Sequence, residues 1–347
     1  MCSRQDAAHG GPPPRVRHHR FDRLRRSALM GRTNVTFHSA GIEIAAHLHT
    51  PDTPASGPRP ALVVGHPGTG VKEQTSGTYA RRMAERGFVA LAFDAAHQGA
   101  SGGLPRGLED PAQRVEDFKA AVSYLTTRPE VDAERIGLLG ICASGGYSLA
   151  AAGGDHRVRA VATVSTADPS RQFRLGADGT QDPAVFQSLL DSAARARTAA
   201  ARGEDPGAME VFPPTAEQAA ALGGEHGAEG FEYYRTPRGG HERSARFLAW
   251  ESVDRLAGYD AFFAVPLIGP RPLLQIIGER AVTAWMAVEA HQRATGPSEV
   301  HRIAGASHVD LYDKEEYVGP AIDRLADFFT THLTTRLTAP GRPATAG

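Results

Sequence analysis

Short apolar runs alternate with helical segments along most of the chain. The first two runs are Pro60–Gly65 and Phe88–Phe93, and a stretch with helical spacing that contains Tyr79 and Met83 lies between them. A buried strand, a helix and a second buried strand form a βαβ unit, in which the two strands are parallel. The pattern continues as a helix near 111–127, a strand at 135–140, a helix after Ser144 and a strand at 158–165. We therefore expect four parallel strands with helices beside them.

Two further regions complete this pattern. Residues 34–51 contain two partly alternating strands around a turn at Ser39–Gly41, which predicts an antiparallel hairpin ahead of the parallel strands. Between about Pro169 and Ser244 the rhythm breaks, and alanine-rich helical pieces alternate with Gly and Pro clusters. The pattern then resumes with strands at 272–277 and 299–303 and helices at 285–293 and 322–334.

Parallel strands on both sides of the insertion favour one domain with a cap over two separate domains. The predicted fold class is α/β, with a mostly parallel central sheet flanked by helices and an inserted helical cap. We expect a basic N-terminal arm, a core in two parts, a cap and a disordered tail rich in Pro and Gly. Their predicted boundaries are 1–33, 34–168 with 245–337, 169–244 and 338–347.

Composition narrows the class of protein. The chain has 347 residues, of which 41% are hydrophobic and 22% charged, so it can bury a substantial core and is neither disordered nor fibrous. No run approaches the roughly 20 apolar residues that a membrane span requires, and the N-terminus lacks the apolar core of a signal peptide. We therefore expect a soluble, cytoplasmic protein with no membrane partner. Two cysteines, Cys2 and Cys142, make a disulfide framework implausible.

Positive charge is concentrated at the N-terminus. Residues 1–32 contain eight arginines and two acids, Asp6 and Asp22, so this segment has a net charge of +6 and the remainder −7. Clustered charge attracts a polyanion such as RNA, a carrier domain or an acidic membrane surface. A block of like charge is more often a solvated tail, so both interpretations stay open.

The segment Arg135–Gly146, RIGLLGICASGG, runs from an apolar strand directly into a glycine-rich helix start. In a nucleophile elbow the reactive side chain occupies a strained turn between strand and helix, and the residues two before and two after it must be small. Gly140 and Ser144 meet this need around Cys142. The turn would expose the sulfur at the carboxyl edge of the sheet, and the helix N-terminus would favour a thiolate. We predict that Cys142 is the nucleophile.

Two alternatives to a nucleophilic Cys142 remain. The segment from Cys142 to Gly146 also has small residues around Ser144, so Ser144 could be the nucleophile and Cys142 a packing residue. We prefer Cys142, because the strand ends at Gly140 and the elbow residue should follow two positions later. The other alternative is an inert cysteine, since free cysteines are often buried.

A thiolate needs a base, which should lie on a loop after the last strand, at the same edge of the sheet. The segment GASHVDLYD, Gly305–Asp313, follows the strand that ends at Ile303. Of the fifteen histidines, His308 therefore has the expected position.

The acid that would orient this imidazole is less clear from the residues. Its usual place is the loop after the strand Leu273–Ile277, where Glu279 is the first choice because the later positions Ala281 and Val282 are not acidic. Asp168, which follows the preceding strand, is the alternative. Either carboxylate could instead be an ordinary solvated loop residue.

Acyl transfer also needs N–H donors for a developing oxyanion, one directly after the nucleophile and one from the loop after an early strand. Ala143 supplies the first donor. The second loop is Gly65–Gly70, whose glycines allow close approach of the backbone, and Gly68 or Thr69 is the expected donor. Glu73 could contact the resting thiol, although an acid at a helix start is the simpler interpretation.

The same loop does not fit a nucleotide site. A P-loop requires lysine directly after its second glycine, whereas Val71 follows Gly70 and Lys72 is displaced. The Gly-x-Gly at 68–70 lacks the third glycine of a dinucleotide fingerprint. The sequence also has no His-Glu-x-x-His helix and no cysteine pair for zinc. We expect no metal and no cofactor.

Four motifs together resemble the α/β-hydrolase superfamily, and the cysteine at the elbow resembles its dienelactone hydrolase branch. As a set they are similar to a group of bacterial hydrolases and fungal polyketide transferases, over about residues 34–335 except much of the cap. The motifs are HPGTGVKEQ at 66–74, FDAAHQGASG at 93–102, GxCxSGG at 140–146 and GASHVDLYD at 305–313.

The resemblance implies an acyl-enzyme, in which Cys142 attacks an ester, thioester or lactone, His308 relays the proton, and the amides of Ala143 and Thr69 hold the oxyanion. We expect a cysteine-dependent acyltransferase or hydrolase with a small-molecule acyl substrate, serving secondary metabolism such as antibiotic biosynthesis. An anionic donor, namely an acyl carrier protein, coenzyme A or an aminoacyl-tRNA, would dock on the basic arm. The alternatives are a plain esterase of the dienelactone type, with water as acceptor, and a non-catalytic binding protein on the same scaffold.

Overall fold

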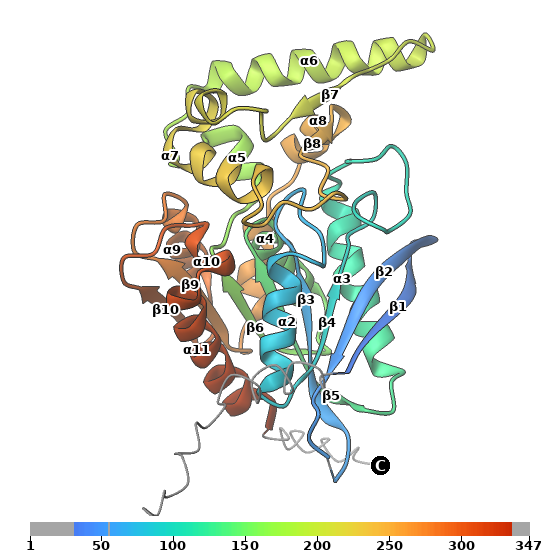
Figure 1. Cartoon of the computed structure of the whole chain (residues 1–347), viewed down its shortest axis with the longest axis vertical. Coiled ribbons are helices and arrows are strands. Elements are labelled where there is room, and N and C mark those ends of the chain that lie inside the picture. The colour runs from blue at the N-terminus through green and yellow to red at the C-terminus, as the bar shows by residue number, and fades with distance from the viewer. Residues whose placement is uncertain (1–30, 55, 335–347) are drawn as a thin grey trace, which may run out of the picture.

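An eight-stranded sheet runs through the centre of the computed structural model, which describes residues 31–54 and 56–334 (Figure 1). The strand order is β1-β2-β4-β3-β5-β6-β9-β10. β1 and β2 form the predicted antiparallel hairpin, β2 pairs antiparallel with β4, and the other pairs are parallel. The strands are β1 (Gly31–Ser39), β2 (Ile42–Thr50), β3 (Arg59–Gly65), β4 (Val89–Phe93), β5 (Val131–Ile141), β6 (Val158–Val164), β9 (Leu273–Gly278) and β10 (Ser298–Ile303).

Helices cover both faces of this sheet, and each face has its own apolar core. The side chains of β3 alternate between the two, because successive residues of a strand point to opposite faces: Ala61 and Val63 join one core, and Leu62 and Val64 the other. The first core is completed by α3 (Pro111–Thr126), α4 (Ala143–Gly154), α9 (Ala284–Arg293) and η1 (Ala261–Ile268). The second is completed by α2 (Thr75–Glu85), α10 (Asp310–Asp313) and α11 (Glu315–Thr334). The predicted α/β class is confirmed.

The segment between β6 and β9 forms most of the upper part of Figure 1. Its elements before η1 are α5 (Pro169–Leu175), α6 (Pro183–Ala201), β7 (Ala208–Glu210), α7 (Ala216–Arg235), β8 (Phe247–Ala249) and α8 (Glu251–Ala257). Helix α7 is kinked, because Gly223 and Gly224 have non-helical backbone angles. β7 pairs with β8 across position 244, where the sequence pattern placed the end of the cap. The division into core and cap stays a prediction.

Some element ends differ from those predicted. Helix α11 begins at Glu315, seven residues before the expected start at Ile322, because Gly319 and Pro320 interrupt the helical signal inside its first turns. Residues 31–33 of the expected arm belong to β1. The rest of the arm and the tail at 338–347 lie outside the described residues.

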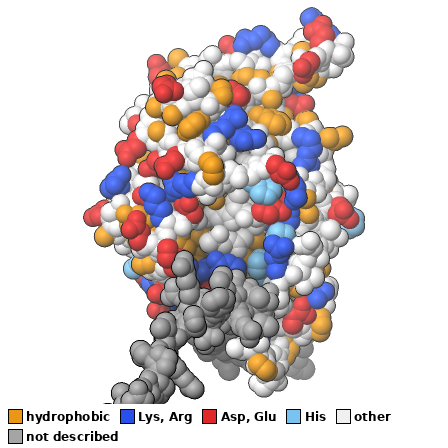
Figure 2. All heavy atoms as spheres, in the orientation of Figure 1, with side chains coloured by type: hydrophobic (Ala, Val, Ile, Leu, Met, Phe, Trp, Pro, Cys, Tyr) orange, Lys and Arg blue, Asp and Glu red, His pale blue; other side chains and the backbone are white. Residues whose placement is uncertain are grey.

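The described surface mixes charges of both signs. Acidic and basic side chains intermingle on the face shown in Figure 2. Among the ion pairs are Arg82–Glu315 at 2.6 Å and Arg238–Asp313 at 2.7 Å. Within residues 31–54 and 56–334, no helix combines the length and the apolar character needed to cross a lipid bilayer.

Candidate active site

Cys142 lies in a sharp turn between β5 and α4, with a left-handed φ of 53° and a ψ of −118°. Its N–H donates to the carbonyl of Val164, and its own carbonyl accepts from the N–H groups of Gly145 and Ala167. A Cβ added to Gly140 would lie 2.1 Å from the carbonyl oxygen of Ser144. Only glycine therefore fits two residues before the cysteine, as the elbow pattern requires.

The sulfur of Cys142 faces four partners. The hydroxyl of Tyr312 and the backbone N–H groups of Ala143 and Gly68 hydrogen-bond it, and Arg114 adds positive charge nearby. Burial is the larger influence and raises the pKa of Cys142 above its usual value, although all four partners oppose it. The sequence suggested that the helix N-terminus favours a thiolate. Burial outweighs that effect, so the resting sulfur is a thiol.

Two amides expected to bind an oxyanion thus converge on the sulfur. Gly68 belongs to the loop after β3, and a Cβ placed on it would lie 3.7 Å from Cβ of Ala143. The neighbouring Thr69 has a left-handed φ of 57°, and its carbonyl accepts from the Ser244 hydroxyl at 2.9 Å. Its own hydroxyl is buried and has no hydrogen-bond partner among the described residues. The loop therefore presents the amide of Gly68 to the sulfur and carries an unpartnered hydroxyl one residue later.

Ser144, the alternative nucleophile, is buried on the first turn of α4. Its hydroxyl donates to the carbonyl of His66 at 2.6 Å and accepts from Nη2 of Arg114 at 3.2 Å. Both bonding directions of the hydroxyl are therefore used in the core. This arrangement favours Cys142 over Ser144 as the nucleophile.

His308 lies on the loop between β10 and α10, with 1% of its surface exposed. Its Nδ1 lies 2.5 Å from Oγ1 of Thr283, and its Nε2 lies 3.1 Å from the hydroxyl of Tyr312. Burial lowers the pKa of His308 well below its usual value, and the neighbouring His226, with ring centres 4.8 Å apart, lowers it further. The imidazole is therefore neutral and held at both nitrogens.

Neither carboxylate expected beside this imidazole hydrogen-bonds it. Glu279 is exposed and accepts from the N–H of Gly305 at 2.9 Å. Asp168 begins helix α5, where it accepts from the N–H of Ser170 and pairs with Arg171 at 2.8 Å. The turn after β9 directs Glu279 outward and brings Thr283 to Nδ1 instead. The expectation of Glu279 or Asp168 as the orienting acid is not supported.

Thr283 and Tyr312 were missed in the sequence. Thr283 occupies the position before α9, but its side chain makes no bond to that helix and contacts His308 instead. Tyr312 comes four residues after His308, the spacing at which residues of a helical turn face the same side. That spacing within GASHVDLYD was the available signal for Tyr312.

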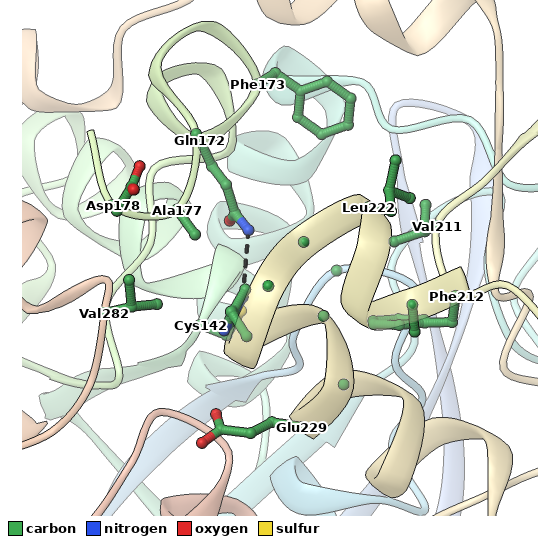
Figure 3. A pocket seen from close by; sticks show the side chains of 18 of the residues that line it. Cys142, Gln172, Phe173, Ala177, Asp178, Val211, Phe212, Leu222, Glu229 and Val282 are labelled. Carbon is green, nitrogen blue, oxygen red and sulfur yellow. Dashed lines mark hydrogen bonds between the residues drawn. The ribbon is translucent and has the colours of Figure 1, made fainter. Parts of the chain in front are cut away.

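A cavity of about 690 Å³ opens beside the sulfur (Figure 3). The loop after β3, the turn at Cys142 and helix α10 contribute five residues to its wall: Gly68, Thr69, Cys142, Ala143 and Tyr312. Most of the remaining wall comes from the segment between β6 and β9, and its apolar side chains include Phe173, Val185, Val211, Phe212, Leu222, Tyr234 and Leu248. Cys142 thus has a largely apolar chamber in front of it.

Comparison with known proteins identifies a family and several relatives. The model of the dienelactone hydrolase family matches residues 44–187. The chain is 39% identical to the uncharacterized protein PA2218 of Pseudomonas aeruginosa over 317 aligned residues. These residues cover 88% of this chain and 82% of that relative. The crystal structure of that hypothetical protein has a TM-score of 0.82, with 88% of this chain and 95% of that chain covered.

Two further relatives have more informative names. The thiohydrolase apmlB of Arthrinium phaeospermum is 33% identical over 239 residues, which cover 65% of this chain and 73% of that relative. The polyketide transferase grgF of a Penicillium species is 26% identical over 287 residues, which cover 81% of this chain and 90% of that relative. The crystal structure of the α/β hydrolase GrgF matches with a TM-score of 0.74 at 24% identity, covering 88% of this chain and all of that one.

Proposed function

The chain belongs to the dienelactone hydrolase family, and on that premise we propose that it is a cysteine-dependent enzyme working through an acyl-Cys142 intermediate. The family resemblance predicted from the motifs is confirmed, and the chain is an ester hydrolase or acyltransferase of the α/β-hydrolase fold. One observation carries the proposal. Cys142 is held at a strained elbow beside the cavity, with the amides of Gly68 and Ala143 against its sulfur.

In the first half of the reaction, the sulfur attacks the carbonyl carbon of an ester or thioester. The C–S bond forms, the carbonyl electrons move onto oxygen, and the N–H groups of Gly68 and Ala143 stabilise that oxyanion. Because the resting sulfur is a thiol, its proton must leave as the bond forms, and the neutral His308 receives it. The oxyanion then collapses, the bond to the leaving group breaks, and the imidazolium returns the proton to that group.

In the second half, water or another nucleophile attacks the thioester on Cys142. Its proton passes to His308 while the new bond forms, and the thiol is restored when the C–S bond breaks. Thr283 is a positioning residue in both halves, because its hydroxyl holds Nδ1 and so orients Nε2. No carboxylate is needed for this orientation.

The apolar walls of the cavity support an apolar substrate, and the names of the relatives support a role in secondary metabolism. We infer an acyl group carried on a thioester or activated ester, with an apolar portion lying among Phe173, Val185 and Phe212. Relatives named thiohydrolase and polyketide transferase fit this substrate class. Docking of an anionic acyl carrier on the basic arm remains a proposal, because residues 1–30 lie outside the described part of the chain.

Kinetics with small acyl donors test the proposal and separate its alternatives. We expect the native chain to consume p-nitrophenyl acetate and an N-acetylcysteamine thioester, and Cys142→Ala to lose this activity by about 1000-fold or more. Cys2→Ala is the matched control and should keep full activity. Added hydroxylamine or amine that appears in the product indicates transfer, whereas release of the free acid alone indicates hydrolysis.

The binding-protein alternative predicts a different result. Under that alternative, neither acyl donor should be consumed at a rate that depends on Cys142. Equal turnover by the native chain and Cys142→Ala would overturn the proposal.

A further inference from the structure

Tyr312 lies between the two groups that exchange a proton in the proposed reaction. Its hydroxyl is 3.1 Å from Nε2 of His308, and the same hydroxyl is the hydrogen-bond partner of the Cys142 thiol. Among the described residues, no hydrogen bond joins the sulfur directly to the imidazole. Any proton that moves between them in the resting arrangement therefore meets the oxygen of Tyr312.

The position of this hydroxyl is well defined by packing. The side chain of Tyr312 is 2% exposed, and its ring lies edge-on to those of Tyr233 and His308, at 5.1 Å and 5.7 Å between ring centres. Burial raises the pKa of Tyr312 well above its usual value, so the phenol stays protonated. It can therefore accept one hydrogen bond and donate another at all working pH values.

We propose that Tyr312 is a catalytic residue that relays the proton between the sulfur of Cys142 and Nε2 of His308. This inference rests on the proposed acyl-enzyme. As the sulfur attacks, the S–H bond breaks and its proton moves to the phenol oxygen, while the phenol's own proton moves to Nε2. The products are a C–S bond, an oxyanion on the former carbonyl oxygen, an unchanged neutral tyrosine and an imidazolium.

The contact at the other nitrogen agrees with this direction. When the Nδ1–H of His308 donates to Oγ1 of Thr283, Nε2 carries the lone pair that faces the phenol. The imidazolium formed by the relay keeps the same two partners, so the ring does not have to rotate. When the leaving group departs, the proton passes from the imidazolium to that group, because the acylated sulfur can no longer accept it.

The pH dependence of acylation gives the sharpest test, because it depends on how the thiol loses its proton. Burial holds the pKa of Tyr234 well above its usual value and lowers that of His226 to about 4. Arg114 is a charged neighbour of the sulfur, and burial raises the pKa of Glu229, which lines the same cavity. A difference between the native and Tyr312→Phe profiles from pH 6 to 9 therefore reports on the thiol proton, because the other groups are the same in both chains.

The experiment measures the burst of p-nitrophenol from p-nitrophenyl acetate by stopped flow in native, Tyr312→Phe and Tyr233→Phe chains. We expect Tyr312→Phe to acylate about 100-fold more slowly at pH 7. Its rate should then rise tenfold per pH unit, because the thiolate forms only by losing its proton to solvent. Tyr233→Phe removes a hydroxyl from the same aromatic cluster, away from the sulfur, and should match the native profile.

A Tyr312→Phe burst within threefold of native at pH 7, with an unchanged pH profile, would overturn the relay. If that variant does not fold, the native chain itself provides the test. The burst rate is then measured in mixtures of H2O and D2O and corrected for the isotope preference of the thiol. A plot of this rate against the deuterium fraction should be curved, because two protons move together. A straight line, which fits the transfer of one proton, would contradict the relay. Turnover of the ester by a native chain that never carries an acyl group on Cys142 would instead refute the acyl-enzyme proposal.

Discussion

Oγ1 of Thr283 lies 2.5 Å from Nδ1 of His308, on the loop where a carboxylate was expected. A hydroxyl fixes the orientation of the ring as a carboxylate would, but it adds no negative charge to stabilise an imidazolium. The base therefore stays neutral at rest, in agreement with the lowered pKa of His308.

Removing the Thr283 hydroxyl should impair catalysis more than folding. One hydrogen bond contributes about 0.5–1.5 kcal/mol, so Thr283→Val should lower kcat/KM up to about tenfold. Thr283→Ser keeps the hydroxyl and should restore most of the rate. Steady-state kinetics with p-nitrophenyl acetate measure both. Equal activity of the Val and native chains would show that the ring needs no partner at Nδ1.

A carboxylate at the same position should change the pH profile rather than the rate alone. Thr283→Asp would place a negative charge beside the imidazole and raise the pKa of His308 toward its usual value. We expect the acid limb of kcat/KM to move to higher pH than in the native chain. The pH dependence between 4.5 and 8 measures this shift. An unmoved acid limb would contradict the contact between position 283 and Nδ1.

The elbow should tolerate no side chain at position 140. The added Cβ in Gly140→Ala would meet the carbonyl oxygen of Ser144 at 2.1 Å, and backbone cannot move aside without opening the turn. We expect a loss of at least about 1–3 kcal/mol in the free energy of unfolding. Gly258→Ala is the control, because its Cβ would meet nothing within 4 Å. Urea denaturation compares the two, and similar stabilities would argue against the crowded elbow.

Buried histidines should make the fold less stable in acid. Burial lowers the pKa of His226 from 6.5 to about 4, so as pH falls below about 6.5 the unfolded chain binds a proton that the folded chain does not. Stability is therefore lost between about pH 6.5 and pH 4, and His226 accounts for at most about 2 kcal/mol of the loss at pH 5.

His226→Gln should accordingly lose less stability than the native chain between pH 7.5 and pH 5. Urea denaturation at the two pH values measures the difference, and His156→Gln, a change at an exposed histidine, is the control. A native-like loss in His226→Gln would mean that this imidazole is protonated in the folded state.

The sequence predicted the strands and the elbow because their signals are local. β3 and β4 are short apolar runs, and the constraint around Cys142 is steric and lies within five residues. The partner of His308 depends on how a turn after β9 directs its side chains, which no local pattern encodes. A carboxylate was sought there, so the hydroxyl of Thr283 was overlooked. The cavity wall is also beyond local patterns, because α5, α6 and α7 contribute to it from separate segments.

Intact-mass spectrometry of the enzyme during turnover tests the central claim most directly. The chain is mixed with an acyl thioester, quenched in acid within seconds, and digested to locate any added mass. We predict one acyl group per chain on the peptide that contains Cys142, in the native and Cys2→Ala chains, and none in Cys142→Ala. An acyl group that persists in Cys142→Ala, or turnover by a native chain that never carries one, would contradict the acyl-enzyme.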